Sequence, residues 1–205
     1  IIGTDFRMAG HRGSVVVNGQ RIAVPLAGRA SLMNVLTVLS VCGDFKVGLS
    51  DCVDIIGRLK PISMRLEVLT AGAVTVLNDC YNANPASMAN ALECLAGFET
   101  SGRRVFIAGV MKELGEQSAM LHAELGRRAA AAGVQVLLAV GEYAEQTAGG
   151  AAAVCPAMQV ETFENTERLC NNLHKYIRGD DIVLVKGSRA AGLEKAVEAL
   201  SKTTF

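Results

Sequence analysis

Residues 181–189 read Asp-Ile-Val-Leu-Val-Lys-Gly-Ser-Arg, a short apolar run followed by two cations, a glycine and a hydroxyl. The run predicts a strand at 181–186, and the pattern that follows predicts a helix at 192–201. The polar residues therefore stand in a strand-to-helix loop. Ligands of open α/β sheets bind beyond the carboxyl ends of the strands, so we expect this loop to contribute to a binding site.

The same alternation of apolar strand and helix extends back to about residue 65. It predicts a mostly parallel sheet with helices on both faces and right-handed crossovers. The short link 70–73 predicts an antiparallel hairpin at one edge. Helix ends are signalled by Asn84 before Pro85, by Asn165 and by Gly133. Strands are predicted at 65–69, 73–78, 103–108, 136–140 and 159–163, and helices at 85–97, 118–132, 142–149 and 165–177.

The first sixty residues have a different pattern. Asn18-Gly19 lies inside a β-rich run, 14–24, and predicts a hairpin because both residues tolerate positive φ. Two helices are then predicted, from Ser31 to about Cys42 and from Ser50 to about Leu59, each with a serine cap. Pro61 ends the second helix. We place a domain boundary here, which gives residues 1–61 and 62–205.

Composition excludes several classes of protein. The 205 residues are half apolar and carry 20 basic and 20 acidic side chains, which argues against disorder, a nucleic-acid coat or a polybasic membrane surface. Aromatics are 4% and Trp is absent, so a base-stacking platform is not expected. No apolar run reaches the roughly 18 residues of a membrane span.

Six cysteines occur without a CxxC pair or zinc-ligand spacing, so no metal site is predicted. We interpret them as reduced, mostly buried thiols of a cytoplasmic protein. The alternative is a disulfide framework, which a chain this apolar does not need.

Four loops carry the candidate chemistry. After strand 73–78 come Asn-Asp-Cys-Tyr-Asn-Ala-Asn-Pro, in which Asp79 suits ribose hydroxyls or the water of a cation. The alternative is an Asx-rich turn with a helix cap, which Asn84 alone would satisfy. After strand 103–108, residues 109–115 place two glycines around Lys112-Glu113, before a helix with His122. A solvated ion pair and a hydrogen-bonded helix histidine are the alternatives there.

The third loop, with Lys186, Ser188 and Arg189, suits a carboxylate or phosphate, although no GxxxxGK[ST] stretch exists in the chain. The alternative is a helix start with solvated charges. In the fourth, Arg65 and Glu67 share a strand face and form a surface pair, or Arg65 swings onto a phosphate. Chemistry alone thus predicts an α/β domain that binds an anionic ligand.

Taken in order, these motifs resemble the Mur ligases over nearly the whole chain. The resemblance rests on residues 79–88, on 109–115 with His122, on 185–189 with Leu193-Glu194, and on 65–67. Tyr-Asn-Ala-Asn-Pro and Lys-Gly-Ser-Arg favour the dipeptide-adding member. It implies a Rossmann-like C-terminal domain at 62–205, preceded by a hairpin-plus-helices remnant of the central ATPase domain at 1–61.

The resemblance also implies a reaction, ATP-dependent (ADP-forming) amide formation through an acyl phosphate in peptidoglycan precursor synthesis. The implied substrates are UDP-N-acetylmuramoyl-tripeptide and D-alanyl-D-alanine, with ATP and Mg²⁺ as cofactors bound mainly upstream. Carried over by position, the implied nucleotide-binding residues are Asn34, Arg65, Asp79, Tyr81 and Asn82, and the substrate-binding residues are Lys186, Ser188 and Arg189. No catalytic residue and no metal ligand is implied within this chain, which we expect to be inactive alone and monomeric.

The chain departs from the family pattern at two places. Residues 28–34 keep only Gly28 and Asn34 of a Gly-x-His-Asn-x-x-Asn motif, because Ala30 and Ser31 replace its imidazole and amide. Val110 stands where the family has Asp. These departures favour an alternative, a stand-alone nucleotide- or peptide-binding module without catalysis, and a structural domain with vestigial motifs is a third hypothesis.

Overall fold

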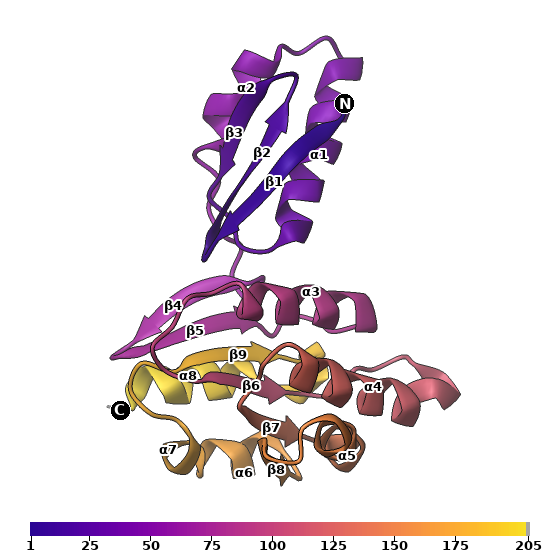
Figure 1. The fold of residues 1–205 in the computed structure, drawn as a ribbon, viewed down its shortest axis with the longest axis vertical. Coiled ribbons are helices and arrows are strands. Elements are labelled where there is room, and N and C mark those ends of the chain that lie inside the picture. Colours follow the sequence, from indigo (N-terminus) through magenta and orange to yellow (C-terminus); the bar gives the residue numbers. More distant parts are fainter. Residues whose placement is uncertain (204–205) are drawn as a thin grey trace. The chain divides into compact units, whose positions relative to one another are not determined.

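The computed structural model describes residues 1–203, which form two compact units divided between residues 62 and 63. Figure 1 colours the N-terminal unit in indigo to purple and the C-terminal unit in magenta to yellow. The sequence-based boundary falls one residue earlier. Each unit has its own hydrophobic core, so each is described separately.

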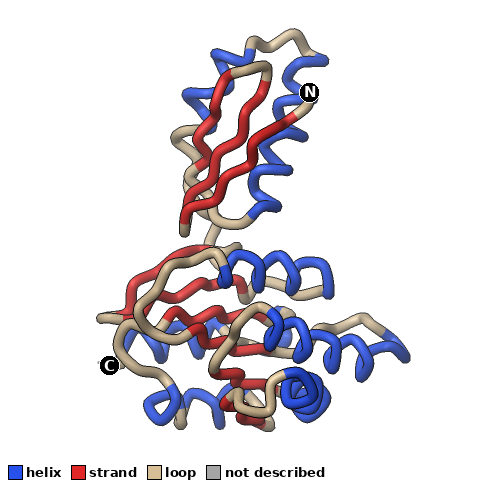
Figure 2. The backbone as a smooth tube through the Cα atoms, viewed as in Figure 1, coloured by secondary structure: helices blue, strands red, loops and turns tan. Residues whose placement is uncertain are grey.

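The N-terminal unit packs two helices against a three-stranded antiparallel sheet of order β1-β2-β3 (Figure 2). The Asn18-Gly19 hairpin is confirmed, with φ of 49° and 79° at the two turn residues. The strand β1 was not predicted from the sequence. The elements are β1 (Gly3–Ala9), β2 (Arg12–Val17), β3 (Gln20–Val24), α1 (Arg29–Asp44) and α2 (Leu49–Ile56).

The predicted serine caps of these helices are wrong. α1 begins after Gly28, whose φ of 79° favours glycine, and α2 begins after Gly48. The Ser31 hydroxyl instead donates to the Ala27 carbonyl oxygen at 2.7 Å, one turn back. Ser50 lies inside the first turn of α2, which ends at Ile56, three residues before the predicted end.

The C-terminal unit contains a six-stranded sheet of order β4-β5-β9-β6-β7-β8. β4 pairs antiparallel with β5, as the short link predicted, and the other described pairings are parallel. The mostly parallel α/β sheet is therefore confirmed. The strands are β4 (Glu67–Ala71), β5 (Val74–Asp79), β6 (Arg104–Ala108), β7 (Val136–Val140), β8 (Gln159–Phe163) and β9 (Ile182–Lys186).

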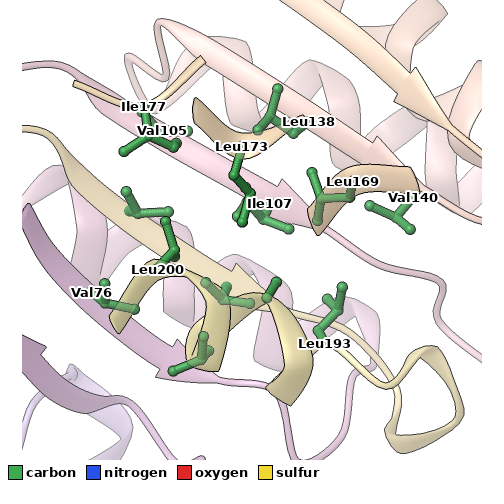
Figure 3. Packing of buried hydrophobic residues seen from close by; sticks show 14 of the residues in the cluster. Val76, Val105, Ile107, Leu138, Val140, Leu169, Leu173, Ile177, Leu193 and Leu200 are labelled. Atoms are coloured by element: carbon green, nitrogen blue, oxygen red, sulfur yellow. The ribbon is translucent and has the colours of Figure 1, made fainter. Parts of the chain in front are cut away.

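Helices cover both faces of this sheet (Figure 1). α3, α4 and α5 pack together on one face, and α6, α7 and α8 cover the other. Figure 3 shows the second layer, in which helix leucines such as Leu173 and Leu200 meet strand residues such as Ile107 and Val76. The helices are α3 (Pro85–Ala96), α4 (Ser118–Ala131), α5 (Ala144–Val154), α6 (Thr166–Cys170), α7 (Leu173–Tyr176) and α8 (Glu194–Lys202), with short 3₁₀ turns η1 (Gly115–Gln117) and η2 (Arg189–Ala191).

Helix ends in this unit follow the sequence to within two residues, with two exceptions. The predicted helix 142–149 is α5, which begins at Ala144 and ends at Val154, five residues later than predicted. Asn84 caps α3 in a reciprocal capping box, and Asn165 caps α6. The predicted helix 165–177 is instead broken into α6 and α7. The break lies at Asn172, whose side-chain amide donates to the Arg168 carbonyl oxygen at 2.8 Å. This bond competes with the backbone hydrogen bond that a continuous helix would form to the same oxygen.

The amino end of the sheet is closed by a buried ion pair. Asp181, just before β9, is 1% exposed and accepts hydrogen bonds from the Arg103 guanidinium at 2.7 and 3.1 Å. The same carboxylate also accepts from the backbone amides of Arg103 and Arg178. Both carboxylate oxygens of Asp181 thus have all their hydrogen-bond partners within the protein. We therefore interpret this ion pair as structural.

α4 and α5 approach each other backbone to backbone at two glycines. A methyl group at Gly126 would overlap the Thr147 carbonyl oxygen, and one at Gly150 would overlap the Ala123 carbonyl oxygen. Gly149, the next residue in α5, is exposed and has open space around it. The two buried glycines therefore fix the distance between these helices.

Gly150→Ala should lower the free energy of unfolding by about 1–3 kcal/mol, because the added methyl pushes α5 away from α4. Gly149→Ala should raise it by roughly 0.5–1 kcal/mol, because alanine favours an exposed helix interior. Urea denaturation of both variants measures the difference. Equal effects of the two substitutions would show that the helices have room to move apart.

Candidate functional site

A cavity of about 620 Å³ lies at the carboxyl end of the sheet, where the loops after β5, β6 and β9 meet. β9 lies between β5 and β6, but its following helix packs on the opposite face from α3 and α4. Chain connections diverge at such a position, and a crevice opens there. The cavity is lined by residues 81–84, 112–114 and 188–190.

A buried ion pair joins the carboxyl ends of β5 and β9, next to the cavity-lining residue Asn82. The Lys186 ammonium, 2% exposed, donates to Asp79 Oδ2 at 2.6 Å and to the Asn82 carbonyl oxygen at 3.0 Å. The backbone amide of Leu66 donates to the other oxygen of Asp79 at 3.1 Å. Lys186, predicted to meet a substrate anion, is in the structure a partner of Asp79.

Burial raises the pKa of Asp79 above its usual value, while the Lys186 ammonium and the Leu66 amide act in the opposite direction. Removing either partner therefore leaves a buried group without its main stabilising contact. The position of the chain from Leu66 to Asn82 depends on this pair.

The loop after β6 is anchored to the loop after β9 by three hydrogen bonds. The Gly109 amide donates to the Lys186 carbonyl oxygen at 2.8 Å, and the Ser188 amide donates to the Val110 carbonyl oxygen at 2.9 Å. The Lys112 amide donates to Ser188 Oγ, also at 2.9 Å. Since the Ser188 hydroxyl accepts here, its own proton can be donated to another group.

His122, in α4, forms a further hydrogen bond to the loop after β6. Its Nε2 accepts from the Met111 amide at 2.9 Å, and its Nδ1 lies 2.7 Å from the Ser118 carbonyl oxygen. The ring is 1% exposed and stacks on Tyr143. The interpretation of His122 as a hydrogen-bonded helix residue is therefore confirmed.

Arg65 stacks on the aromatic ring of Tyr81, with the guanidinium carbon 4.2 Å from the ring centroid. The predicted strand from residue 65 is wrong at its start, because positive φ at Met64 and Leu66 delays β4 until Glu67. The interpretation of Arg65 and Glu67 as a surface pair is also wrong. Glu67 Oε2 instead accepts from the Ser63 hydroxyl, the Met64 amide and the amide group of Asn78.

Exposed cations stand at the edges of the cavity. Arg189 has a side chain 57% exposed, with Nη1 3.0 Å from the Met64 sulfur and 3.9 Å from Glu194 Oε2. Lys112 pairs with Glu142 at 3.2 Å, not with its neighbour Glu113, and both partners are about half exposed. Such contacts are weak enough to be exchanged for a ligand anion.

The remaining predicted residues lie as follows. Tyr81 is 47% exposed at the cavity, and Asn82 uses its side-chain oxygen to accept from the Ala83 amide at 2.8 Å. Asn34 belongs to the other unit, on the exposed side of α1. Val110, which replaces the family's Asp, is buried.

Sequence reasoning did not identify Glu142 and Tyr143, which follow β7. Glu142 forms an ion pair with Lys112, and Tyr143 stacks on His122. Their position after a predicted strand was the available signal. All six cysteines lie within the described residues as thiols, and three of them are buried. No group of three or more His, Cys, Asp or Glu suited to a metal occurs among residues 1–203.

Fold and site together define an α/β domain whose cavity presents cations, hydroxyls and amides at the carboxyl edge of a mostly parallel sheet. The family model "Mur ligase, glutamate ligase domain" matches residues 64–189. The chain therefore belongs to the Mur ligase family. No helix in the described part of the chain is long and apolar enough to cross a membrane.

Relatives of this chain carry the name UDP-N-acetylmuramoyl-tripeptide–D-alanyl-D-alanine ligase, among them proteins from Escherichia coli and Bacillus subtilis. The chain is 35% identical to the Escherichia coli protein over 98% of its own length and 42% of that relative. It is 26% identical to the Bacillus subtilis protein over 86% of its own length and 39% of that relative. The chain thus spans less than half the length of the relatives it matches.

Solved structures support the fold. A crystal structure of MurF from Acinetobacter baumannii superposes with a TM-score of 0.86 at 22% identity, over 98% of this chain and 44% of that one. MurF from Thermotoga maritima in complex with ADP gives a TM-score of 0.79 at 21% identity, over 98% and 46%.

Lys186→Met should lower the free energy of unfolding by about 3–5 kcal/mol at neutral pH, because it leaves the Asp79 carboxylate buried beside an apolar side chain. Lys195→Met, an exposed lysine of α8, should change it by less than about 0.5 kcal/mol. Chemical denaturation measures both. A small loss for Lys186→Met would mean that Asp79 takes up a proton in the variant and does not stay a buried carboxylate.

Proposed function

We propose that this chain is the C-terminal portion of an ATP-dependent ligase that adds D-alanyl-D-alanine to UDP-N-acetylmuramoyl-tripeptide in peptidoglycan precursor synthesis. Membership of the Mur ligase family and the two named relatives support the proposal. The observation that carries it is the cavity, because its three loops are the family-like motifs and it gathers cations around a space of small-ligand size.

Residues 1–61 would be the end of the central ATP-binding domain, and residues 62–205 the Mur ligase C-terminal domain. Together with the part of its relatives that this chain does not span, the chain would act as a cytoplasmic monomer. ATP and Mg²⁺ would be bound mainly by that part. The isolated chain would be inactive.

On the nucleotide side, Arg65 would leave the Tyr81 ring and neutralise phosphate charge. A guanidinium stacked on an exposed ring has a defined position but is weakly bound there. Its contact with the ring can therefore be replaced by a stronger contact with an anion. Asp79 would meet the ribose through the lone pairs that Lys186 and Leu66 leave unused. Tyr81 and Asn82 would line this side of the cavity. Asn34, in the N-terminal unit, stays a proposed nucleotide-binding residue.

On the acceptor side, Arg189 would bind the dipeptide carboxylate, and the Ser188 hydroxyl would donate a second hydrogen bond. The buried Lys186 would act on this substrate through the loop that it holds, since its ammonium is turned toward Asp79. The reaction needs the dipeptide amine held against an acyl phosphate, so positioning and charge neutralisation would supply most of the rate enhancement.

A chimera tests the proposal. The part of the Escherichia coli relative that this chain matches is replaced by this chain, and phosphate release is measured with ATP, UDP-N-acetylmuramoyl-tripeptide and D-alanyl-D-alanine. We expect dipeptide-dependent turnover, and none from the isolated chain. A folded chimera that binds nucleotide but never consumes dipeptide would contradict the proposal.

A second candidate is a stand-alone nucleotide- or peptide-binding module, favoured by Ala30, Ser31 and Val110. It requires saturable binding of Mg-ATP or of the dipeptide to the isolated chain, with no turnover in the chimera. Calorimetric titration of the isolated chain with each ligand separates the two candidates. Loss of that binding in Tyr81→Ala, which truncates an exposed residue of the cavity lining, would place the ligand in the cavity.

Arg189→Ala in the chimera should raise the KM for D-alanyl-D-alanine by roughly 10- to 100-fold, the usual worth of a hydrogen bond to a charged group. The KM for ATP should stay within twofold. Arg128→Ala, which removes an exposed arginine that pairs with Glu124, is the control. A raised KM for ATP alone would move Arg189 to the nucleotide side.

A further inference from the structure

The two nitrogen atoms of His122 have partners of opposite kind. Nε2 faces the Met111 amide, which can only donate, and Nδ1 faces the Ser118 carbonyl oxygen, which can only accept. One protonation state satisfies both partners, the neutral ring with its proton on Nδ1. An imidazolium would direct an Nε2–H against the Met111 N–H at 2.9 Å.

The surroundings of the ring favour that neutral state. Burial lowers the pKa of His122 below its usual 6.5, and the Ser118 carbonyl oxygen and Glu142 act in the opposite direction. Lys112 adds to the lowering. Tyr143 covers one face of the ring at a centroid distance of 4.6 Å and an interplanar angle of 25°. The charged groups that face His122 are therefore Lys112 and Glu142.

The backbone amide of Met111 lies in the loop of residues 109–114, next to the part of this loop that lines the cavity. The next residue, Lys112, lines the cavity and is anchored through its own amide to Ser188. Glu113 follows with a φ of 65°, a conformation that an unrestrained non-glycine residue seldom adopts. The Met111–His122 hydrogen bond thus secures the turn that presents Lys112 and Glu113.

We propose that His122 is a positioning residue, a neutral hydrogen-bond acceptor that holds loop 109–114 in its cavity-lining conformation and releases that loop when it is protonated. The inference deepens the proposed function, because this loop lines the proposed substrate cavity. It does not depend on that function, since the hydrogen bond and its pH dependence belong to this chain alone.

The direction of the pH effect follows from proton binding. When the loop opens, the exposed ring returns toward its usual pKa of 6.5 and binds a proton more readily than the closed one. The closed loop is fully stable above pH 6.5 and loses stability as the pH falls from there toward the lower pKa of the closed state. Within that window, the opening equilibrium rises roughly tenfold for each pH unit.

Hydrogen exchange at the Met111 amide, followed by NMR from pH 8 to pH 5 and corrected for the intrinsic rate, measures the opening directly. Wild-type protection should fall below pH 6.5 as described. His122→Gln keeps an acceptor near the Nε2 position but cannot titrate, so its protection should show no such fall. His122→Leu removes the acceptor, and protection should be at least tenfold lower at every pH.

His174→Gln is the matched control, because His174 is exposed in α7 and its replacement should leave the pH profile of Met111 unchanged. Wild-type protection that stays constant while the His122 ring titrates would overturn the proposal, even if both variants failed to fold. Full protection in a folded His122→Leu would overturn it as well. If the profile is as expected but the folded chimera never consumes dipeptide, the positioning role stands and the proposed function fails.

Discussion

The buried contact between Lys186 and Asp79 is the constraint on which the site depends. The two residues are 107 positions apart in sequence and lie at the carboxyl ends of neighbouring parallel strands. Their ion pair fixes the point at which the loops after β5 and β9 begin. The Leu66 amide, just before β4, donates to the same carboxylate. A buried pair of this kind contributes little net stability compared with an apolar pair, but it specifies one arrangement and penalises others.

Around this pair, buried groups set the shape of the cavity and exposed groups are left for ligands. Ser188 and His122 accept backbone amides of the loop after β6, and both are almost fully buried. Arg65 and Arg189 have looser partners, an aromatic ring and a thioether sulfur. A site divided in this way can exchange its outer contacts for a ligand without changing its backbone.

The sheet could be predicted from sequence because each apolar run allows only a strand buried on both faces, and the asparagine caps act locally. Asn172 broke a predicted helix because its side chain competes for backbone groups, which apolar periodicity does not register. The loop residues of the candidate site were identified by type. Their pairings could not be predicted from the sequence. Asp79 and Lys186 come together only because β5 and β9 are neighbours in the sheet. Lys112 likewise pairs with Glu142, which follows the neighbouring strand β7, and not with the adjacent Glu113.

The two left-handed residues on either side of Arg65 have a mechanical consequence. Met64 and Leu66 hold φ of 61° and 48°, which costs roughly 1–2 kcal/mol for each side chain that carries a Cβ. The segment is held in this conformation by three hydrogen bonds. The Met64 amide donates to Glu67, the Leu66 amide donates to Asp79, and the Tyr81 amide donates to the Met64 carbonyl oxygen. The strained conformation of Met64 and Leu66 therefore depends on these hydrogen bonds. Loss of the bond between the Leu66 amide and Asp79 would favour relaxation of the backbone on both sides of Arg65.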